Sequence, residues 1–304
     1  MPKIKILSKQ DIKSFNSPPK LNSQDRLLYF SLSDWERSIL ETFRSPSNKV
    51  AFILQLGYFK ATKQFYSYES FHNKDIEYAI KLLGFHKEKL NLIPYDRKTA
   101  SRNKSIILSH FGYMPFDRVS RELLIKEADI ISLQQQKPKS IFFHLVSFLE
   151  TKKIEVPMYN TFAEVITNSL NNTEKQLISI IKDEIKEDVS NLLNELLEAD
   201  DKYNDKENIL LKRSKLTMMK KINLSTRPGK IKDNVCDFIS KKELFDKTRS
   251  TLGRLSLSDT AIQYFAYFTL KSRTFQISQF SKQYKRYLYL ICFIANQYYK
   301  HHDI

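Results

Sequence analysis

The chain has 304 residues, of which 41% are hydrophobic, so it is long enough to bury a substantial core and too apolar for a disordered tail. It has only 5 glycines, and none lie close enough together for a phosphate-cradling glycine-rich loop, which excludes nucleotide chemistry of the Walker and dinucleotide-binding types. The formal net charge of +16 favours a polyanionic partner, nucleic acid before an acidic membrane surface.

The positive charge is unevenly distributed along the chain. Residues 1–150 carry 24 basic and 15 acidic side chains, and residues 151–208 carry 7 basic and 13 acidic ones. Residues 209–304 are again strongly basic, with 19 basic and 6 acidic side chains. Two basic blocks therefore flank an acidic one, whose carboxylates are typical of solvated helix faces and predict neither a metal site nor an acid/base pair.

Cysteine, histidine and hydropathy patterns predict no metal, cofactor or catalytic residue in this chain. Cys236 and Cys292 lie far apart, and the six histidines form no zinc pattern, so buried thiols in a reducing cytoplasm are expected. The first residues contain no apolar run of a signal peptide, and the longest apolar stretch, 287–295, is far shorter than the ~20 residues of a membrane span. We expect no membrane partner and a cytoplasmic protein.

Helix signals recur along the first part of the chain. Ser33 and Glu36 have capping-box spacing, and residues 48–59 are apolar nearly all round, which predicts a buried central helix. Residues 73–84 have one apolar face and end at Gly84, where a helix is expected to stop. Ser120 opens a further helix that ends before 137–140, and we place the first domain boundary near residue 138.

The remaining elements are also predicted to be helical. A helix over 140–150 and an extended link over 151–157 precede helices that begin at the boxes Thr161/Glu164 and Thr173/Gln176. Residues 256–270 and 281–299 form two strongly apolar helices. The sequence predicts an all-α fold of two or three helical subdomains with helix-turn-helix-like DNA-binding elements, divided as 1–138 (DNA-binding), 139–208 (acidic helices) and 209–304 (a basic segment and an apolar helical domain).

The stretch YDRKTASRNKSIILSHFGYMPF, residues 95–116, has no acid between Asp96 and Asp117. On a helix, Lys98, Arg102, Ser105 and Ser109 fall within about 60° of one another. Ile107, Leu108 and Phe111 fall opposite, Lys104 lies at the edge of that apolar side, and Gly112 is expected to cap the helix. Such a helix can dock on a core and offer its first half to DNA, or it can be an ordinary surface helix with lysines.

A second basic stretch, residues 209–232, also contains no acid. A membrane-surface helix is the alternative, but Thr217 and the Pro228-Gly229 break interrupt its apolar face, so nucleic acid is favoured. Contact of all eight basic residues with phosphates would give a log K against log salt slope of roughly −7. The eight expected contacts are Lys212, Arg213, Lys215, Lys220, Lys221, Arg227, Lys230 and Lys232.

Residues 95–113 resemble a segment, Y-D-x-R-T-x-x-R-H-R-x-x-I-L-x-x-x-G-F, of the N-terminal region of Tn-3 family transposases, which belong to replicative class II bacterial transposons. Asn103 stands where that family has histidine. NKVAFILQLGYFK, EVPMYNTFAEVI and the stretch from DTAIQYFAY to RYLYLICFI resemble further segments in the same order. The matching residues of the first segment are Tyr95, Asp96, Lys98, Thr99, Arg102, Lys104, Ile107, Leu108, Gly112 and Tyr113.

The resemblance implies that this chain is the end-recognition part of a transposase, which binds the terminal inverted repeats as double-stranded DNA, as a possible homodimer. It also implies a bacterial protein that is associated with the nucleoid in the cytoplasm. It also implies that strand cleavage belongs to a later RNase H-like DDE-type domain that uses Mg²⁺ on three carboxylates, so we expect no activity from this chain by itself. The expected DNA contacts carried by the first segment are Arg97, Lys98, Thr99, Arg102, Asn103, Lys104 and Ser105.

Two other functions remain open at this point. A helical interaction or regulatory protein that pairs with a full-length transposase would use its basic faces only for solubility. An RNA-binding protein would bind hairpin or single-stranded RNA more tightly than duplex DNA, but few aromatic residues accompany the basic runs, which disfavours base stacking.

Overall fold

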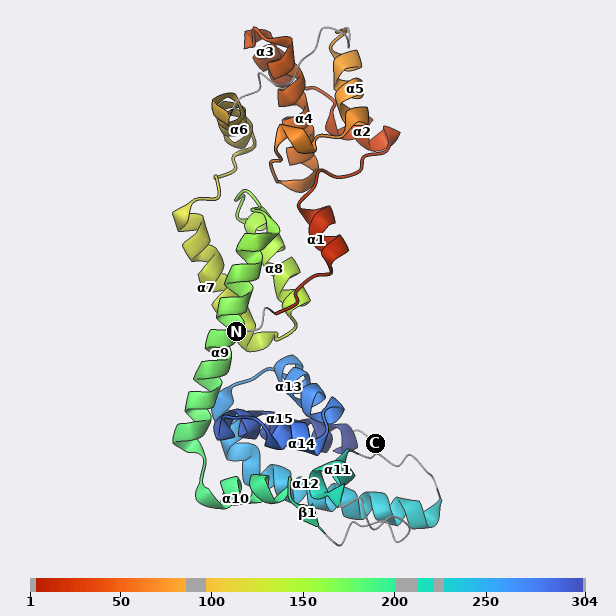
Figure 1. Cartoon of the computed structure of the whole chain (residues 1–304), viewed down its shortest axis with the longest axis vertical. Coiled ribbons are helices and arrows are strands. Elements are labelled where there is room, and N and C mark those ends of the chain that lie inside the picture. The colour runs from red at the N-terminus through yellow and green to blue at the C-terminus, as the bar shows by residue number, and fades with distance from the viewer. Residues whose placement is uncertain (1–3, 86–96, 201–212, 221–226, 303–304) are drawn as a thin grey trace. The chain divides into compact units, whose positions relative to one another are not determined.

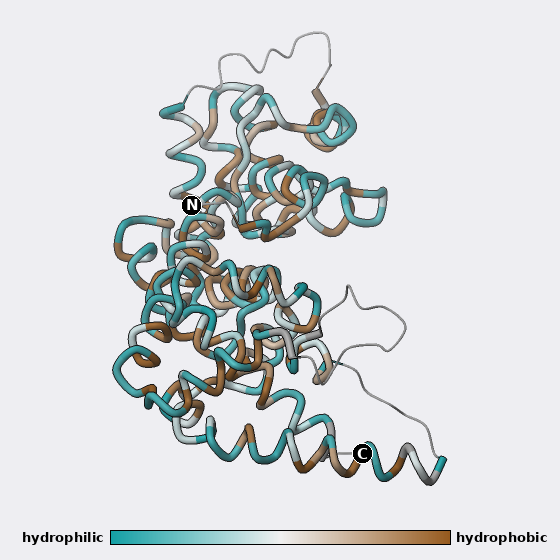
Figure 2. Tube along the Cα trace, turned by 60° about the horizontal axis from the view of Figure 1, so that its bottom comes forward, coloured by the Kyte–Doolittle hydropathy of each residue, from teal (hydrophilic) through white to brown (hydrophobic). Residues whose placement is uncertain are grey.

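A computed structural model describes residues 4–85, 97–200, 213–220 and 227–302 of the chain (Figure 1). Within these residues the fold is all-α, as predicted, and the only strands are two residues long, with Ala199 paired antiparallel to Ser214. Most helices show teal and brown alternating along the trace, the pattern of helices with one apolar face (Figure 2). The helix-turn-helix-like elements stay a prediction.

The chain forms two compact units, which we call unit 1 (Met1–Ala128 and Pro138–Thr167) and unit 2 (Asp129–Lys137 and Asn168–Ile304). α7 (Arg118–Gln134) and α9 (Tyr159–Glu184) each continue from unit 1 into unit 2. The other elements of unit 1 are α1 (Lys9–Phe15), α2 (Ser23–Tyr29), α3 (Asp34–Thr42), α4 (Pro46–Thr62), the 3-10 helix η1 (Tyr68–Ser70), α5 (Asn73–Leu82), α6 (Arg97–Phe111) and α8 (Pro138–Thr151). Those of unit 2 are α10 (Glu187–Glu195), β1 (Ala199–Asp200), β2 (Arg213–Ser214), α11 (Lys215–Met219), α12 (Pro228–Leu255), α13 (Asp259–Lys271), α14 (Thr274–Ser278) and α15 (Gln283–His302).

This division differs from the three parts expected from the sequence. The expected boundary at residue 138 marks the start of α8, which belongs to unit 1 because its Phe142 ring packs 5.0 Å from Phe15 and 5.1 Å from Phe162, centroid to centroid. At Lys137-Pro138 the chain passes from unit 2 back into unit 1, so residues on both sides of the expected boundary belong to unit 1. The second expected boundary, near residue 208, lies outside the described residues.

Several helix ends follow the chemistry read from the sequence. Ser33 and Glu36 form the expected capping box at α3, in which the Ser33 amide donates to Glu36 Oε2 at 2.7 Å. Gly84 ends α5 with a φ of 69°, in the left-handed region where a side chain is disfavoured. The last turn is closed by the amide of Phe85, which donates to the Ile80 carbonyl at 3.0 Å.

The region around Thr173 differs from the expectation. Two helices were predicted, beginning at Thr161 and at Thr173, but α9 runs unbroken from Tyr159 to Glu184. No proline or glycine interrupts it, and Thr173 is buried within the helix, so its side chain acts as a packing residue and not as a cap.

The core of unit 1 surrounds α4, which is buried along its whole middle, Val50–Phe59. This confirms the prediction of a central helix that is apolar nearly all round. Phe30, Tyr58 and Phe59 are among the largest fully buried side chains of the protein.

We expect Gly57→Ala to lower the free energy of unfolding by about 1–2 kcal/mol, because an added Cβ would overlap the ring of fully buried Phe30. Overpacking costs ~1–3 kcal/mol, and the gain in helix propensity returns at most ~1. Gly253→Ala in α12 is the matched control, since a Cβ there meets no atom within 4 Å, and it should stabilise. Denaturant unfolding of both variants checks this, and a change in the free energy of unfolding of the same sign in both would contradict it.

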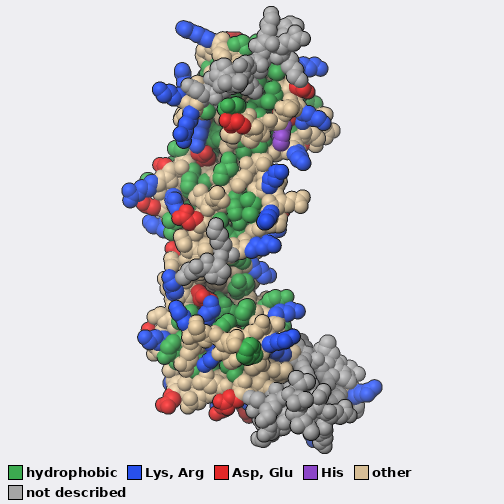
Figure 3. Space-filling view, viewed as in Figure 1, with side chains coloured by type: hydrophobic (Ala, Val, Ile, Leu, Met, Phe, Trp, Pro, Cys, Tyr) green, Lys and Arg blue, Asp and Glu red, His purple; other side chains and the backbone are tan. Residues whose placement is uncertain are grey.

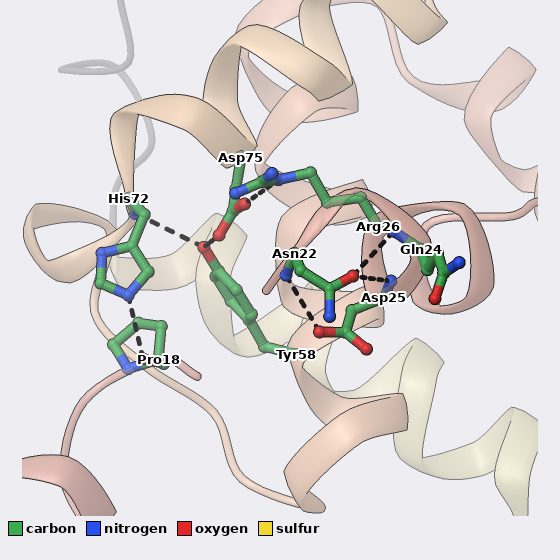
Figure 4. A network of polar contacts seen from close by, with 8 residues as sticks. All are labelled: Pro18, Asn22, Gln24, Asp25, Arg26, Tyr58, His72 and Asp75. Atoms are coloured by element: carbon green, nitrogen blue, oxygen red, sulfur yellow. Dashed lines mark hydrogen bonds and ion pairs between the residues drawn. The ribbon is translucent and has the colours of Figure 1, made fainter. Parts of the chain in front are cut away.

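A polar network lies behind the surface of unit 1 and joins α2, α4 and α5 (Figure 4). Asp75, which is fully buried, accepts hydrogen bonds from Arg26 Nε at 2.6 Å and from the Tyr58 hydroxyl at 2.7 Å. Burial, and then the hydrogen bond to Asp75, raises the pKa of Tyr58. The network therefore pairs Asp75 with Arg26 and keeps Tyr58 as a neutral donor.

The core of unit 2 surrounds α15, whose residues Tyr287–Ala295 are all buried. This confirms that the longest apolar stretch of the sequence is a buried core helix. Among the described residues, no helix is both long enough and apolar enough to cross a membrane.

The two thiols of unit 2 should differ sharply in reactivity. Cys292 is fully buried in α15, and burial raises the pKa of its thiol, whereas Cys236 is exposed on α12 and departs from the expectation of two buried thiols. We expect a thiol reagent to modify one cysteine of the native protein and two in denaturant. Cys236→Ala should abolish the native reaction, and fast modification of that variant would contradict the buried position of Cys292.

Candidate nucleic-acid interface

α6, the helix expected to contact DNA, is docked on unit 1 by its apolar side. Ile107 and Leu108 are buried in the core that surrounds α4. Gly112 follows the helix with a φ of 66°, and the Tyr113 amide donates to the Leu108 carbonyl at 2.8 Å, which confirms the predicted glycine cap. The helix is therefore held firmly by its second half.

Asn103 was expected to face DNA, but the structure places it on the docked side. Its side chain is fully buried, and Asn103 Nδ2 donates to Asn48 Oδ1 of α4 at 2.7 Å. Helical spacing could have predicted that Asn103 is buried, because it lies four residues before Ile107 and so shares its face. Asn103 thus fastens α6 to α4 and leaves the set of expected DNA contacts.

Lys104 is also turned toward the protein. Its Nζ lies 2.6 Å from Glu155 Oε1 and 5.3 Å from the centre of the Phe65 ring. The buried Glu155 carboxylate cancels the charge of Lys104, so this lysine is a tether of α6 and not a free cation for phosphate. The sequence predicts Lys104 both at the edge of the apolar side and as a DNA contact, but in the structure it pairs with Glu155 instead of standing free for DNA.

The outward side of α6 carries the remaining expected contacts. Within the described residues, Arg97, Lys98 and Arg102 form no ion pair, and α6 itself contains no acid. Thr99 is half-buried, and the Ser105 hydroxyl donates to the Ser101 carbonyl at 3.1 Å. We call the exposed set the α6 basic face: Arg97, Lys98, Ser101, Arg102 and Ser105.

Basic side chains project from the edge of unit 1 where α6 lies (Figure 3). Arg97, Lys98 and Arg102 are exposed to solvent, whereas Asn103 contacts Asn48 and Lys104 contacts Glu155. A rigid, positively charged helix face of this kind can contact a phosphate backbone and place arginine and serine side chains against base edges.

Trp35 is an aromatic neighbour of α6 that the sequence did not link to this site. Its ring stacks on His110 in the last turn of α6, with centroids 3.6 Å apart and an interplanar angle of 4°. Trp35 is the single tryptophan of the chain, so tryptophan fluorescence reports on this contact between α3 and α6. Sequence spacing cannot reveal this contact, because the two residues lie on different helices.

The second basic stretch, 209–232, is described only in part and lies in unit 2. Lys212 and Lys221 fall outside the described residues, and Arg213 and Lys230 are described by backbone alone. Lys215 is half-buried at the start of α11, and Arg227 and Lys232 are exposed at the start of α12.

Lys220 is not the free surface cation expected from the sequence. Its Nζ donates to the Ser272 carbonyl at 2.6 Å, and burial lowers its pKa. Leu216 and Met219 beside it are buried, which fixes α11 in the core of unit 2. This part of the stretch is therefore a packed helix.

Among the described residues, no group of three or more His, Cys, Asp or Glu side chains could hold a metal ion. The candidate site is a basic helix face on an all-α unit, whose guanidinium, ammonium and hydroxyl groups can donate hydrogen bonds to an anion.

Comparison with known families places the first half of the chain in a family. A model described as "Domain of unknown function (DUF4158)" matches residues 6–168, which is more than half of the 304 residues. The chain belongs to the DUF4158 family. The match covers α6 and nearly all of unit 1. No curated protein matches the chain.

Proposed function

We propose that unit 1 binds double-stranded DNA sequence-specifically through the α6 basic face, and that its target is the terminal inverted repeat of a transposon. The observation that carries this proposal is the division of α6 into two sides. Ile107 and the Asn103–Asn48 hydrogen bond lock one side to the core, while the other side presents cations without an acid.

A duplex suits this helix better than single-stranded nucleic acid does. The major groove of B-DNA, about 12 Å wide, admits one α-helix, and the exposed cations of α6, Arg97, Lys98 and Arg102, all lie in its N-terminal half. Arg102 can donate to the O6 and N7 of guanine, and Lys98 can contact a phosphate. Single-strand binding would need stacking aromatics, and the α6 basic face contains none.

The choice of terminal repeats rests on the resemblance to Tn-3 family transposases. In such a protein, strand cleavage would belong to a separate domain that uses Mg²⁺, so the proposal for this chain concerns DNA binding alone.

Selection of duplexes from a random pool tests the proposal directly. We expect one motif to be enriched and to match the repeats that flank the transposon, with binding followed by Trp35 fluorescence. Arg102→Ala should relax the selected motif at one or two positions. A pool that stays random after selection would contradict the proposal.

A helical interaction protein is the second candidate, favoured by an apolar stripe on α12. Ile231, Val235 and Ile239 recur at four-residue spacing, and each is about half exposed, from 49% to 53%. Such a stripe is typical of a helix that pairs with another helix. Light scattering of the chain with and without a full-length transposase distinguishes association from a monomer.

A further inference from the structure

Unit 1 has a second basic surface, formed by elements other than α6. Two adjoining hollows of about 520 and 370 Å³ share Lys20 and His72 as lining residues. The larger one is lined mainly by α1 and the segment that follows it, and the smaller one extends over the start of α5. We call the two together the α1–α5 groove.

Three lysines from three different elements line this groove. Lys13 comes from the last turn of α1, Lys20 from the link before α2, and Lys74 from the first turn of α5. All three are exposed, and within the described residues none forms an ion pair. Neither hollow has an acidic lining residue, so the lysine charges add.

The wall of the groove is fixed by hydrogen bonds. The His72 ring contacts the Pro18 carbonyl through Nε2 at 3.0 Å, which ties the link before α2 to the start of α5. The backbone amide of His72 donates to the Tyr58 hydroxyl at 3.4 Å (Figure 4). Lys20 and Lys74 therefore stand on segments that are joined to each other, and the groove is formed before a ligand binds.

The buried carboxylate behind the groove does not cancel its charge. Asp75 is neutralised by Arg26, whose Nε lies 2.6 Å away and whose residue lines the smaller hollow. The groove thus keeps the net charge of three lysines, and the positive end of α5 at Asn73 adds to it.

We propose that the α1–α5 groove binds phosphate groups of a nucleic-acid backbone. The lysines are spread over two hollows instead of meeting at one point, which suits successive phosphates of a chain better than a single phosphate ion. Such contacts position DNA without reading its sequence. The inference rests on the proposed DNA binding and adds a second, sequence-independent contact outside α6.

The test compares Lys20→Gln/Lys74→Gln with Lys81→Gln/Lys126→Gln, a control that removes two exposed lysines outside the groove. Each lost phosphate contact lowers the salt slope by about 0.9 and affinity at ~0.1 M salt by about 8-fold. We expect the groove variant to bind every duplex on the order of 10- to 60-fold more weakly, selected and scrambled alike. Lys20→Arg/Lys74→Arg should bind like the natural protein.

Equal losses in the groove and control variants would overturn the proposal, as would an unchanged slope in the groove variant. A thermal-shift measurement with inorganic phosphate, added at constant ionic strength, tests whether the groove binds free phosphate instead of a nucleic-acid backbone. Stabilisation by phosphate that needs Lys20 and Lys74, with DNA binding unchanged, would assign the groove to free phosphate and also overturn the proposal.

The outcomes separate the groove from the α6 site. If only α6 variants weaken DNA binding, the groove proposal fails and the proposed function stands. If all duplexes bind equally and only the groove variant weakens them, sequence-specific recognition fails and the groove stands. If the natural protein binds no DNA, both fail.

Discussion

Asp75→Asn is expected to lower the free energy of unfolding by about 3–5 kcal/mol, the cost of removing one partner from a buried ion pair. The carboxylate is fully buried and is bonded to both Arg26 and Tyr58. The amide keeps the shape of the side chain but leaves the Arg26 charge without compensation. The variant loses stability because the contacts that join α2, α4 and α5 are weakened.

Denaturant unfolding measures this change, with Lys242→Ala as the control. Lys242 pairs with Asp246 at 2.6 Å, but the two side chains are 52% and 49% exposed, so solvent screens this pair and its loss should change stability far less. Arg26→Met combined with Asp75→Asn should recover part of the loss, because no buried charge is then unpaired. Equal effects of Asp75→Asn and Lys242→Ala would contradict the buried pair.

Replacement of Arg97, Lys98 and Arg102 together by glutamine is expected to weaken binding to a scrambled duplex by about 3–4 kcal/mol at ~0.1 M salt, because three cations that contact phosphates are lost. Binding to the selected duplex should weaken more, because the base contact of Arg102 is lost as well. The salt slope should fall by about 2.7. Since all three side chains are exposed, folding stability should stay within ~0.5 kcal/mol. The change thus separates DNA binding from folding.

Arg118→Ala is the control for single changes in α6. Its side chain is 92% exposed on α7, where it pairs with Glu122 of the same helix, so the variant loses the same charge outside the α6 basic face. Arg102→Ala should cost about 1–3 kcal/mol on the selected duplex and less on scrambled DNA if Arg102 reads a base. A loss that is equal on both duplexes would make Arg102 a phosphate contact.

Much of the fold could be predicted from local patterns. The capping box at Ser33, the glycine stops at Gly84 and Gly112, and the buried helices α4 and α15 follow from side-chain chemistry within a few residues. Such signals depend only on residues close together in the sequence, so a single sequence is enough to recognise them. The capping-box pattern at Thr173 gave a wrong prediction, because Thr173 is packed in the core and α9 continues past it.

The candidate interface could be predicted in outline but not residue by residue. The basic stretch identified α6, yet charge alone could not show that Lys104 meets Glu155, which lies 51 residues further along the chain. Helical spacing could have placed Asn103 inside, but its partner Asn48 lies on another helix. The groove was missed entirely, because Lys13, Lys20 and Lys74 belong to three separate elements that only the fold brings together.

The central claim, sequence-specific recognition of duplex DNA by the α6 basic face, is tested most directly by one ratio. The affinity of the natural chain for the selected duplex is divided by its affinity for a scrambled duplex at physiological salt, with Trp35 fluorescence as the readout. We predict a ratio of about 10³ or more, the range of specific DNA-binding proteins, and a fall toward 1 when Arg97, Lys98 and Arg102 are replaced. A ratio near 1 for the natural chain would contradict the claim.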